Sequence, residues 1–122
     1  ATFSRAVTVK TGNEMMYVSG TASVGAKGEV MYKGDFNSQV RQMFDNVTDD
    51  LKEGHYSWKN VVRTTIYLKN IDENYEEFNK IRAELFKYKY NINVDEFPAS
   101  TCIEARLCWS ELLCEMEVIA VK

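Results

Sequence analysis

The sequence predicts an α+β fold in which two helices cover one face of a mixed β-sheet. Segments rich in β-branched and aromatic residues alternate with two segments whose apolar residues recur at helical spacing. The expected order is strand, strand, strand, helix, strand, helix, strand, strand. Because strand–helix–strand connections cross right-handed, both helices should pack on the same face of one sheet. The result is a two-layer sandwich.

The first strands are expected in the N-terminal quarter of the chain. Residues 2–10 and 14–19 are rich in β-branched and aromatic side chains, and a turn at Gly12 separates them. A glycine-rich turn at 25–28 then precedes a short strand, which we expect over Glu29–Tyr32.

Two amphipathic helices are expected next. In Asp35–Lys52, apolar residues recur at spacings of three and four, and either Asp35 or Asn37 is placed to cap the N-terminus. The segment Ile71–Lys87 repeats this pattern, with Asp72 as its expected cap.

The remaining strands are expected over Asn60–Lys69, Ser100–Cys108 and Leu112–Lys122. The first and the last of these carry aliphatic side chains on both faces, although helices cover only one face. An uncovered apolar face predicts self-association. Ligand sites then fall naturally in clefts between subunits.

The composition limits the functions that are open to the chain. Its 122 residues are expected to form one domain over 1–122. With 15 basic and 18 acidic residues the net charge is −3, so no overall basic field attracts nucleic acid or acidic lipid. No apolar run reaches the ~18 residues that span a bilayer. The first ten residues lack the apolar core of a signal peptide, so we expect a cytoplasmic protein.

The cysteines and the histidine do not suggest a metal site. An odd number of cysteines (Cys102, Cys108 and Cys114) without a CxxC pair favours free thiols in a reducing compartment. The only histidine, His55, lies in a segment that is expected to be a loop. Structural zinc needs four ligands at tighter spacing, and we expect no bound metal.

The most informative pattern is a set of segments in a fixed order. The run Pro98–Leu107 (PASTCIEARL) is accompanied by Val18–Ala22 (VSGTA), Asn60–Leu68 (NVVRTTIYL), Tyr75–Asn79 (YEEFN) and Glu115–Val121 (EMEVIAV). Together these segments resemble the YjgF family, also called Rid, the reactive intermediate deaminases, over nearly the whole chain. The resemblance implies a chorismate-mutase-like homotrimer with three small-molecule sites in clefts between subunits. It also implies hydrolysis of enamines and imines to a keto acid and ammonia, without a cofactor.

The resemblance assigns the catalytic role to Glu115. In the family a glutamate at this point of the last strand orients a water for attack on the imine carbon. A carboxylate suits this step because the attacking water must lose a proton. Glu117, two residues further on, is an equal rival by composition. Gly20, whose lack of a side chain allows close approach to the backbone, and Asn79 match positions that border the ligand.

The main departure from the family pattern lies at Ser100. The deaminase subgroup has Pro-Ala-Arg-Ser/Thr-Cys here, and its arginine binds the substrate carboxylate. The residues on either side match, and Thr101 and Cys102 are expected to contact the ligand beside Ser100. A serine hydroxyl does not replace the charge of a guanidinium. We therefore expect a larger or differently charged enamine or imine rather than a small 2-imino acid.

Two other arginines, Arg106 and Arg5, are candidates to replace the missing charge. Arg106 shares a strand face with Ser100, but six residues place it roughly 20 Å along the strand, which is too far. Arg5 is the alternative anion-binding residue. It lies near Phe3, which matches a family aromatic at the border of the site.

Two other functions are open alongside the deaminase. One is a trimer that binds a small metabolite without turning it over, which Ser100 favours. The other is cleavage of RNA, which is described for other members of the family. The negative net charge disfavours RNA binding, although residues 80–90 interleave basic and aromatic side chains.

Overall fold

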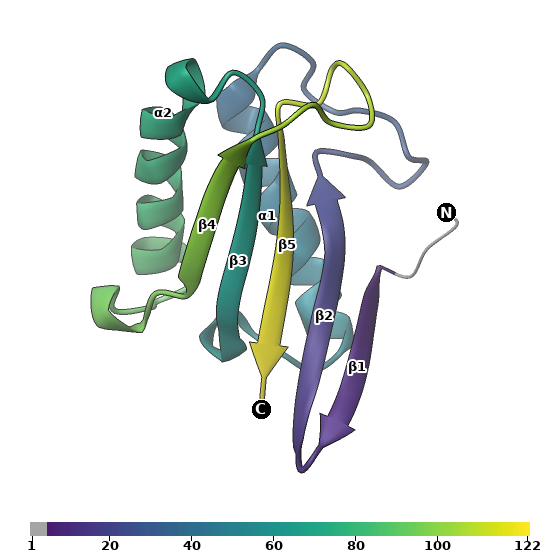
Figure 1. The fold of residues 1–122 in the computed structure, drawn as a ribbon, viewed down its shortest axis with the longest axis vertical. Helices are drawn as coiled ribbons and strands as arrows, with labels where there is room; N and C mark the ends of the chain where they lie inside the picture. The colour runs from purple at the N-terminus through teal and green to yellow at the C-terminus, as the bar shows by residue number, and fades with distance from the viewer. Residues whose placement is uncertain (1–4) are drawn as a thin grey trace.

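A computed structural model describes residues 5–122 and has the predicted α+β architecture (Figure 1). Five strands form one sheet in the order β1-β2-β5-β3-β4, in which only β3 and β4 run parallel. The elements are β1 (Ala6–Thr11), β2 (Asn13–Ala22), α1 (Phe36–Glu53), β3 (Val61–Leu68), α2 (Ile71–Glu84), β4 (Ala99–Glu104) and β5 (Cys114–Val121).

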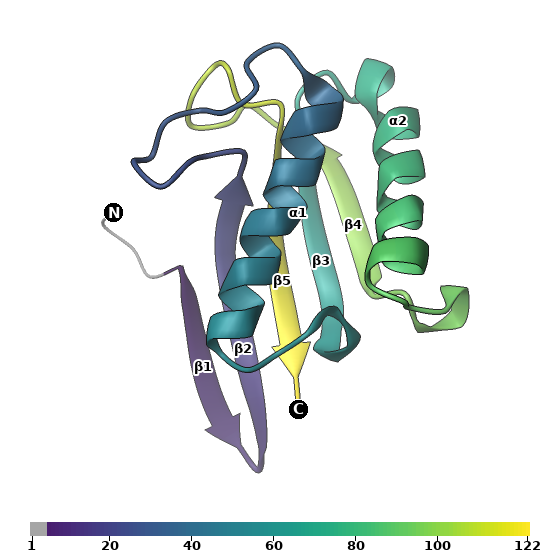
Figure 2. The same cartoon turned by 180° about the vertical axis from the view of Figure 1, so that it is seen from behind.

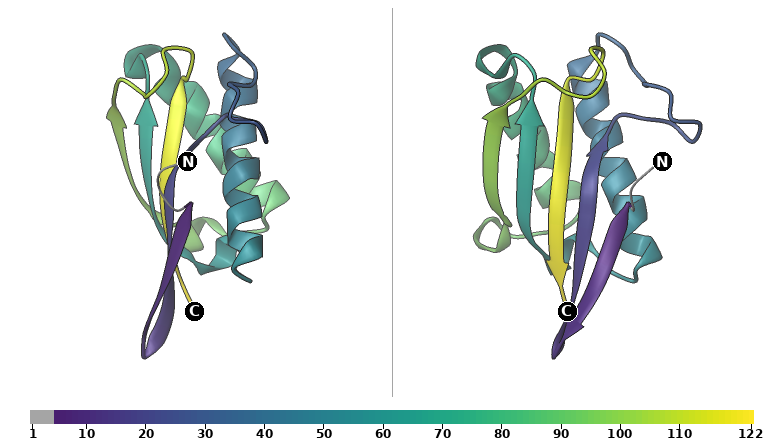
Figure 3. Two further views of the ribbon diagram at one scale, coloured as in Figure 1. Left: turned by 90° about the vertical axis from the view of Figure 1, so that its right-hand side faces the viewer. Right: turned by 45° about the vertical axis from the view of Figure 1, so that its right-hand side comes forward.

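Both helices lie on the same face of the sheet, as Figure 2 shows from the helix side. Seen edge-on, the sheet and the helices form two layers (Figure 3). The other face is uncovered by any element of residues 5–122, and we call it the open face. None of the helices in this part of the chain has the length and apolar character needed to cross a membrane.

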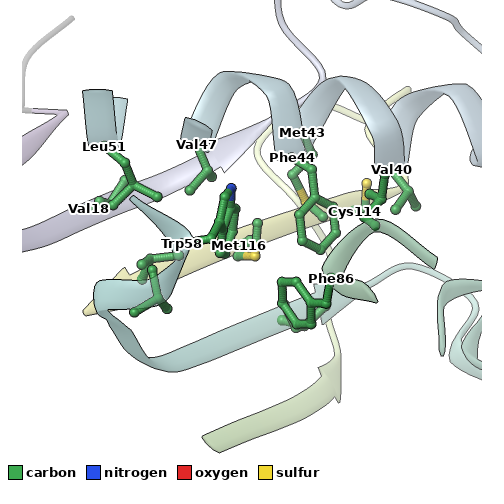
Figure 4. Close-up of a cluster of buried hydrophobic side chains, with 14 of the residues drawn as sticks. Val18, Val40, Met43, Phe44, Val47, Leu51, Trp58, Phe86, Cys114 and Met116 are labelled. Atoms are coloured by element: carbon green, nitrogen blue, oxygen red, sulfur yellow. The ribbon is translucent and has the colours of Figure 1, made fainter. Parts of the chain in front are cut away.

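The core lies between α1 and the central strands (Figure 4). The predicted stripe of α1 forms its centre, and each of its side chains is at most 1% exposed: Val40, Met43, Phe44, Val47 and Leu51. The ring of Phe44 lies within 6.4 Å of four other aromatic rings, those of Trp58, Phe78, Phe86 and Tyr90. Each buried aromatic or aliphatic side chain stabilises the fold by about 1.5–3 kcal/mol.

A buried glutamine joins α1 to the loops at one end of the sheet. The Gln39 side chain is fully buried, and its amide nitrogen donates to the carbonyl oxygens of Tyr32 (3.2 Å) and Glu111 (3.0 Å). Its amide oxygen accepts from the backbone N–H of Leu113 (2.9 Å). One side chain thus satisfies three backbone groups and positions the chain that enters β5.

The strand expected over Glu29–Tyr32 is absent, and that prediction was wrong. An isolated bridge between Val24 and Val30 is all that forms there. The segment bonds to its own loop, since the N–H of Met31 donates to the carbonyl of Ser23 and the Ser23 hydroxyl donates to the Met31 carbonyl. These local bonds replace pairing with the sheet.

β4 and β5 are shorter than expected. β4 ends at Glu104 rather than Cys108 because its partner β3 ends at Leu68, and no further strand edge is available for pairing. β5 begins at Cys114, two residues late, because the backbone just before it bonds to Gln39.

The cap expected for α2 was also wrong. The helix begins after Asn70, which has a left-handed backbone (φ 51°), and not at Asp72. The first N–H of the helix, that of Ile71, donates to the carboxylate of Glu104 at 3.0 Å, so an acceptor from β4 replaces a local cap. At the other end α2 widens into a π-helical turn over Leu85–Lys89.

Replacing Gln39 with leucine tests the buried glutamine. Because three backbone groups lose their partner while the volume is kept, we expect the free energy of unfolding to fall by about 2–4 kcal/mol. Urea denaturation followed by circular dichroism measures this change. Gln42→Leu is the matched control, since the Gln42 amide donates to Asn46 on its own helix (2.9 Å), and it should cost less than about 1 kcal/mol. Equal stability of the two variants would contradict the role of Gln39.

Candidate functional site

Glu115 of β5 and Gly20 of β2 lie beside each other on the open face. Glu115 alternates with the buried Cys114 and Met116 of β5, so its side chain points away from the helices. A Cβ atom placed on Gly20 would overlap with Oε1 of Glu115. Glycine at this position therefore leaves the space that the carboxylate occupies.

Arg5 lies against the same part of β2. Its Nη2 donates to the carbonyl of Gly20 (3.2 Å) and to the hydroxyl of Thr21 (3.1 Å). The register between β2 and β5 shifts between Val18 and Thr21, and such irregularities redirect the backbone locally. The charge of Arg5 opposes the effect of burial on the pKa of Glu115 and also on that of Asp50 in α1. Arg5 therefore lies on the β2 side of the sheet, between these two carboxyl groups, and the position of Ser100 is on β4 at the other edge.

Burial distinguishes Glu115 from its rival Glu117. The pKa of Glu115 is raised, first by burial and then by the nearby charge of Glu117, while the charge of Arg5 opposes the rise. Glu117 is exposed, and the hydroxyl of Tyr67 donates a hydrogen bond to it, which raises the pKa of Tyr67. A half-buried carboxylate with a raised pKa is the better candidate for a general base.

Ser100, Cys102 and Asn79 form a second group on the helix side of the sheet. Arg82 of α2 joins them, because its Nη1 donates to the hydroxyl of Ser100 (2.9 Å) and its Nη2 to the amide oxygen of Asn79 (2.7 Å). Cys102 packs against the core, and burial raises the pKa of its thiol. A protonated, packed thiol is a poor nucleophile.

Thr101 faces the other way. Its hydroxyl accepts a hydrogen bond from Arg63 Nη2 at 2.7 Å, and Arg63 lies on the open face of β3. In the sheet register Thr101 stands beside Thr65, which stands beside Glu117. Thr101 therefore shares a face with Glu115, with β3 between them.

Within one chain the predicted residues form two groups and not a single site. In the sheet register, Ser100 of β4 pairs with Thr64 of β3, and Thr64 pairs with Val118 of β5. Val118 lies three positions from Glu115 along β5. The two groups are separated by two strand spacings of about 4.8 Å each and lie on opposite faces of the sheet. Phe3 lies outside the described residues.

Arg82 is the functional candidate that sequence reasoning missed. Ile81 and Arg82 are neighbours in α2, and the structure buries Ile81 while Arg82 is half-buried toward β4. The available signal was the spacing of Asn79 and Arg82, which places them on one side of a helix. Arg106, in contrast, lies beyond the end of β4 and is exposed.

The described residues offer no cluster of metal ligands. Between residues 5 and 122, no three His, Cys, Asp or Glu side chains gather in an arrangement that could hold a metal ion. His55 is exposed in the loop that follows α1.

The fold defines the class of protein as a two-layer α+β sandwich with one uncovered sheet face. The sequence model of the family described as Endoribonuclease L-PSP matches residues 1–122. The chain therefore belongs to this family, which is also known as the YjgF, RutC or Rid family, and the resemblance seen in the motifs is confirmed.

Relatives and solved structures agree with this assignment. A RutC family protein of Pasteurella multocida is 32% identical over 115 residues, covering 93% of this chain and 84% of the relative. One from Pyrococcus horikoshii is 29% identical over 114 residues, covering 93% and 83%. The crystal structure of the E. coli YjgF gene product has a TM-score of 0.81 at 30% identity, covering 98% of this chain and 87% of that one. Yeast Mmf1 has a TM-score of 0.83 at 28% identity, covering 100% and 88%.

The electrostatic arrangement can be tested by titration. We expect Glu115 to titrate above the ordinary range of glutamates, and Arg5→Gln to raise its pKa further, because the charge that opposes the rise is removed. Carbon-13 NMR of the side-chain carboxyl groups measures both values. Lys10→Gln, which removes an exposed charge paired with Glu14, should leave Glu115 unchanged. A Glu115 that titrates in the ordinary range, or ignores the loss of Arg5, would refute the arrangement.

Proposed function

We propose that the protein is a homotrimeric hydrolase of a reactive enamine or imine, with each site shared between two copies of the chain. In each site, Glu115 of one copy activates the attacking water beside a ligand held by the Ser100 group of the next copy. The observation that carries this proposal is the separation of the two groups within one chain. Only a second copy can place Ser100 and Cys102 opposite Gly20 and Glu115.

The character of the open face supports assembly. Exposed apolar side chains lie on it along three strands: Val7 and Val9 of β1, Tyr17 of β2 and Ile103 of β4. Charged side chains of the strands between them, Arg63 of β3 and Glu117 of β5, lie on the same face. Apolar side chains grouped with polar ones on a face without a covering layer mark an interaction surface. Its centre is hollowed over β2, β3 and β5, where Ser19, Thr65 and Ile119 line a depression that a partner's side chains can fill.

The main requirement of the proposed reaction is a correctly positioned general base. An enamine first tautomerises to the imine. Water then attacks the imine carbon while Glu115 accepts its proton, and Glu115 passes this proton to the nitrogen to give an amino alcohol. The hydroxyl proton of the amino alcohol moves to the nitrogen as the carbonyl forms and the C–N bond breaks, which releases ammonia. Positioned acid–base catalysis of this kind contributes about 10²- to 10⁴-fold. The space left by Gly20 keeps the backbone beside Glu115 accessible to the ligand.

A second candidate is a trimer that binds a metabolite without turnover. Ser100 supports it, because the residue at this position supplies a neutral hydroxyl in place of the charge expected of a deaminase. RNA cleavage, the activity named in the family description, gains little support here. Two carboxylates, Glu115 and Glu117, lie on the open face and would repel a phosphate backbone.

Replacing Glu115 with glutamine tests the base. We expect ammonia release from freshly generated 2-aminoacrylate, or from a bulkier enamine, to fall about 10²- to 10⁴-fold. The variant should not be less stable at neutral pH. A carboxyl group with a raised folded-state pKa stabilises the fold only while it is protonated, and this contribution is lost as the pH rises through that pKa. Thermal melting at pH 7 checks the second point.

Glu117→Gln is the matched comparison, since it removes the neighbouring carboxylate of the same strand. We expect its loss of activity to be less than about tenfold, well below that of Glu115→Gln. Equal losses in the two variants, or full activity of Glu115→Gln, would overturn the assignment of the base. An inactive wild type that still binds the ketone product would favour the non-catalytic alternative.

Mixing two inactive variants tests whether the site is shared. We expect Glu115→Gln and Ser100→Trp each to be inactive. The tryptophan side chain at the exposed position 100 would block the part of the site that β4 contributes. Refolded together in equal amounts, they should recover about a quarter of wild-type activity, because about one cleft in four then contains both intact halves. Light scattering should give a mass of about three chains. No recovery in a mixed trimer would show that both halves of the site belong to one chain.

A further inference from the structure

The guanidinium of Arg82 lies between α2 and β4 in contact with uncharged groups. It donates to the amide oxygen of Asn79 and to the hydroxyl of Ser100, and its carbon lies 4.9 Å from the centre of the Phe78 ring. Phe78 is fully buried and Arg82 is half-buried. A cation is thus held rigidly at the border of the core by partners that do not neutralise it.

Arg41 gives a direct comparison within the same helical layer. It also donates to an asparagine, Asn37 (2.8 Å), but its other partner is the carboxylate of Glu84 at 2.7 Å. Across residues 5–122, the carboxylates that form ion pairs within 4.0 Å do so with cations other than Arg82. The fold therefore neutralises one of these two arginines and leaves the other without an anion.

The neighbouring thiol does not supply the counter-ion. Burial raises the pKa of Cys102, so this side chain is neutral at physiological pH. Burial also lowers the pKa of Arg82, which reflects the cost of removing its charge from water. A guanidinium keeps N–H donors free after two hydrogen bonds, in a planar geometry that matches a carboxylate. The unpaired charge and the free donors point to an anion that arrives with the ligand.

We propose that Arg82 is the anion-binding residue of the site, and that it receives a carboxylate or similar anionic group of the ligand beside Ser100. This inference rests on the proposed function for the location of the site. The small Ser100 side chain is what allows the guanidinium to reach β4 from the helix. The ligand is then an enamine or imine that carries an anionic end, and the serine at 100 no longer argues against a 2-imino acid. Arg5, the alternative considered from the sequence, lies beside Glu115 instead.

Binding of pyruvate and its uncharged analogue pyruvamide separates recognition of charge from general packing. We expect Arg82→Gln to weaken pyruvate binding about 10- to 100-fold in calorimetry, the usual effect of losing a hydrogen bond to a charged group. Pyruvamide binding should change less than about twofold. Arg41→Gln is the matched control and should bind both ligands as the wild type does. A parallel loss for both ligands, or no loss for pyruvate, would overturn the inference.

Moving the charge provides a second test that a merely structural role would not satisfy. Ser100→Arg alone should bind pyruvate at least as tightly as the wild type, because a second guanidinium beside Arg82 adds attraction for the carboxylate. Ser100→Arg combined with Arg82→Gln should restore binding to within about tenfold of wild type, a strongly non-additive result. A double variant as weak as Arg82→Gln alone would count against an anion site at this point.

The readouts also separate this inference from the proposed hydrolase. Selective loss of pyruvate binding in Arg82→Gln, with no ammonia release even by the wild type, would support the anion site and reject the hydrolase. Ammonia release by the wild type, with pyruvate binding unaffected in Arg82→Gln, would reject the anion site and keep the hydrolase. A wild type that binds pyruvate no better than pyruvamide would overturn the inference.

Discussion

The alternation of side chains across the sheet determines both what stabilises this protein and where its chemistry can occur. Along β5, Cys114, Met116, Val118 and Ala120 are buried under the helices, so the residues between them point to the open face. A shift of one residue would exchange the two sets and place carboxylates in the core. Packing of α1 against this face therefore fixes the direction of Glu115, and the position of the candidate base follows from the packing of the core.

The fold was predictable where the local pattern and the tertiary contacts agree. The apolar stripe of α1 was predictable because residues at helical spacing all pack into the same core. The two-layer arrangement follows from the right-handedness of the strand–helix–strand connections. Strand limits were not predictable, because they depend on the partner. β4 stops where β3 stops, and Glu29–Tyr32 has the composition of a strand but bonds to Ser23. Neither fact is encoded in the segment itself.

The candidate site was likewise predictable only in part. The family resemblance assigned both Glu115 and Gly20 to the site, but the order of elements along the chain does not say which strand lies beside β5. Arg82 was missed because it reaches Ser100 across the layers, from a position 18 residues earlier in the chain. On the strand itself, Arg106 is too distant to replace the arginine of the family pattern. Two layers bring residues together in ways that distance along one strand does not indicate.

In the proposed trimer, assembly and acid–base chemistry would be coupled. A second copy on the open face would remove water from Glu115, which is already half-buried, and further burial raises the pKa of a carboxyl group. A base is most effective when its pKa approaches the operating pH, so the proposed contact would also strengthen the base. The charge of Arg5 opposes this rise in the pKa of Glu115 and favours its ionised form. On the other side of the proposed cleft, a ligand anion would neutralise the charge of Arg82, which has no anionic partner in the fold. One half of the site would then depend on the second copy of the chain, and the other half on the ligand.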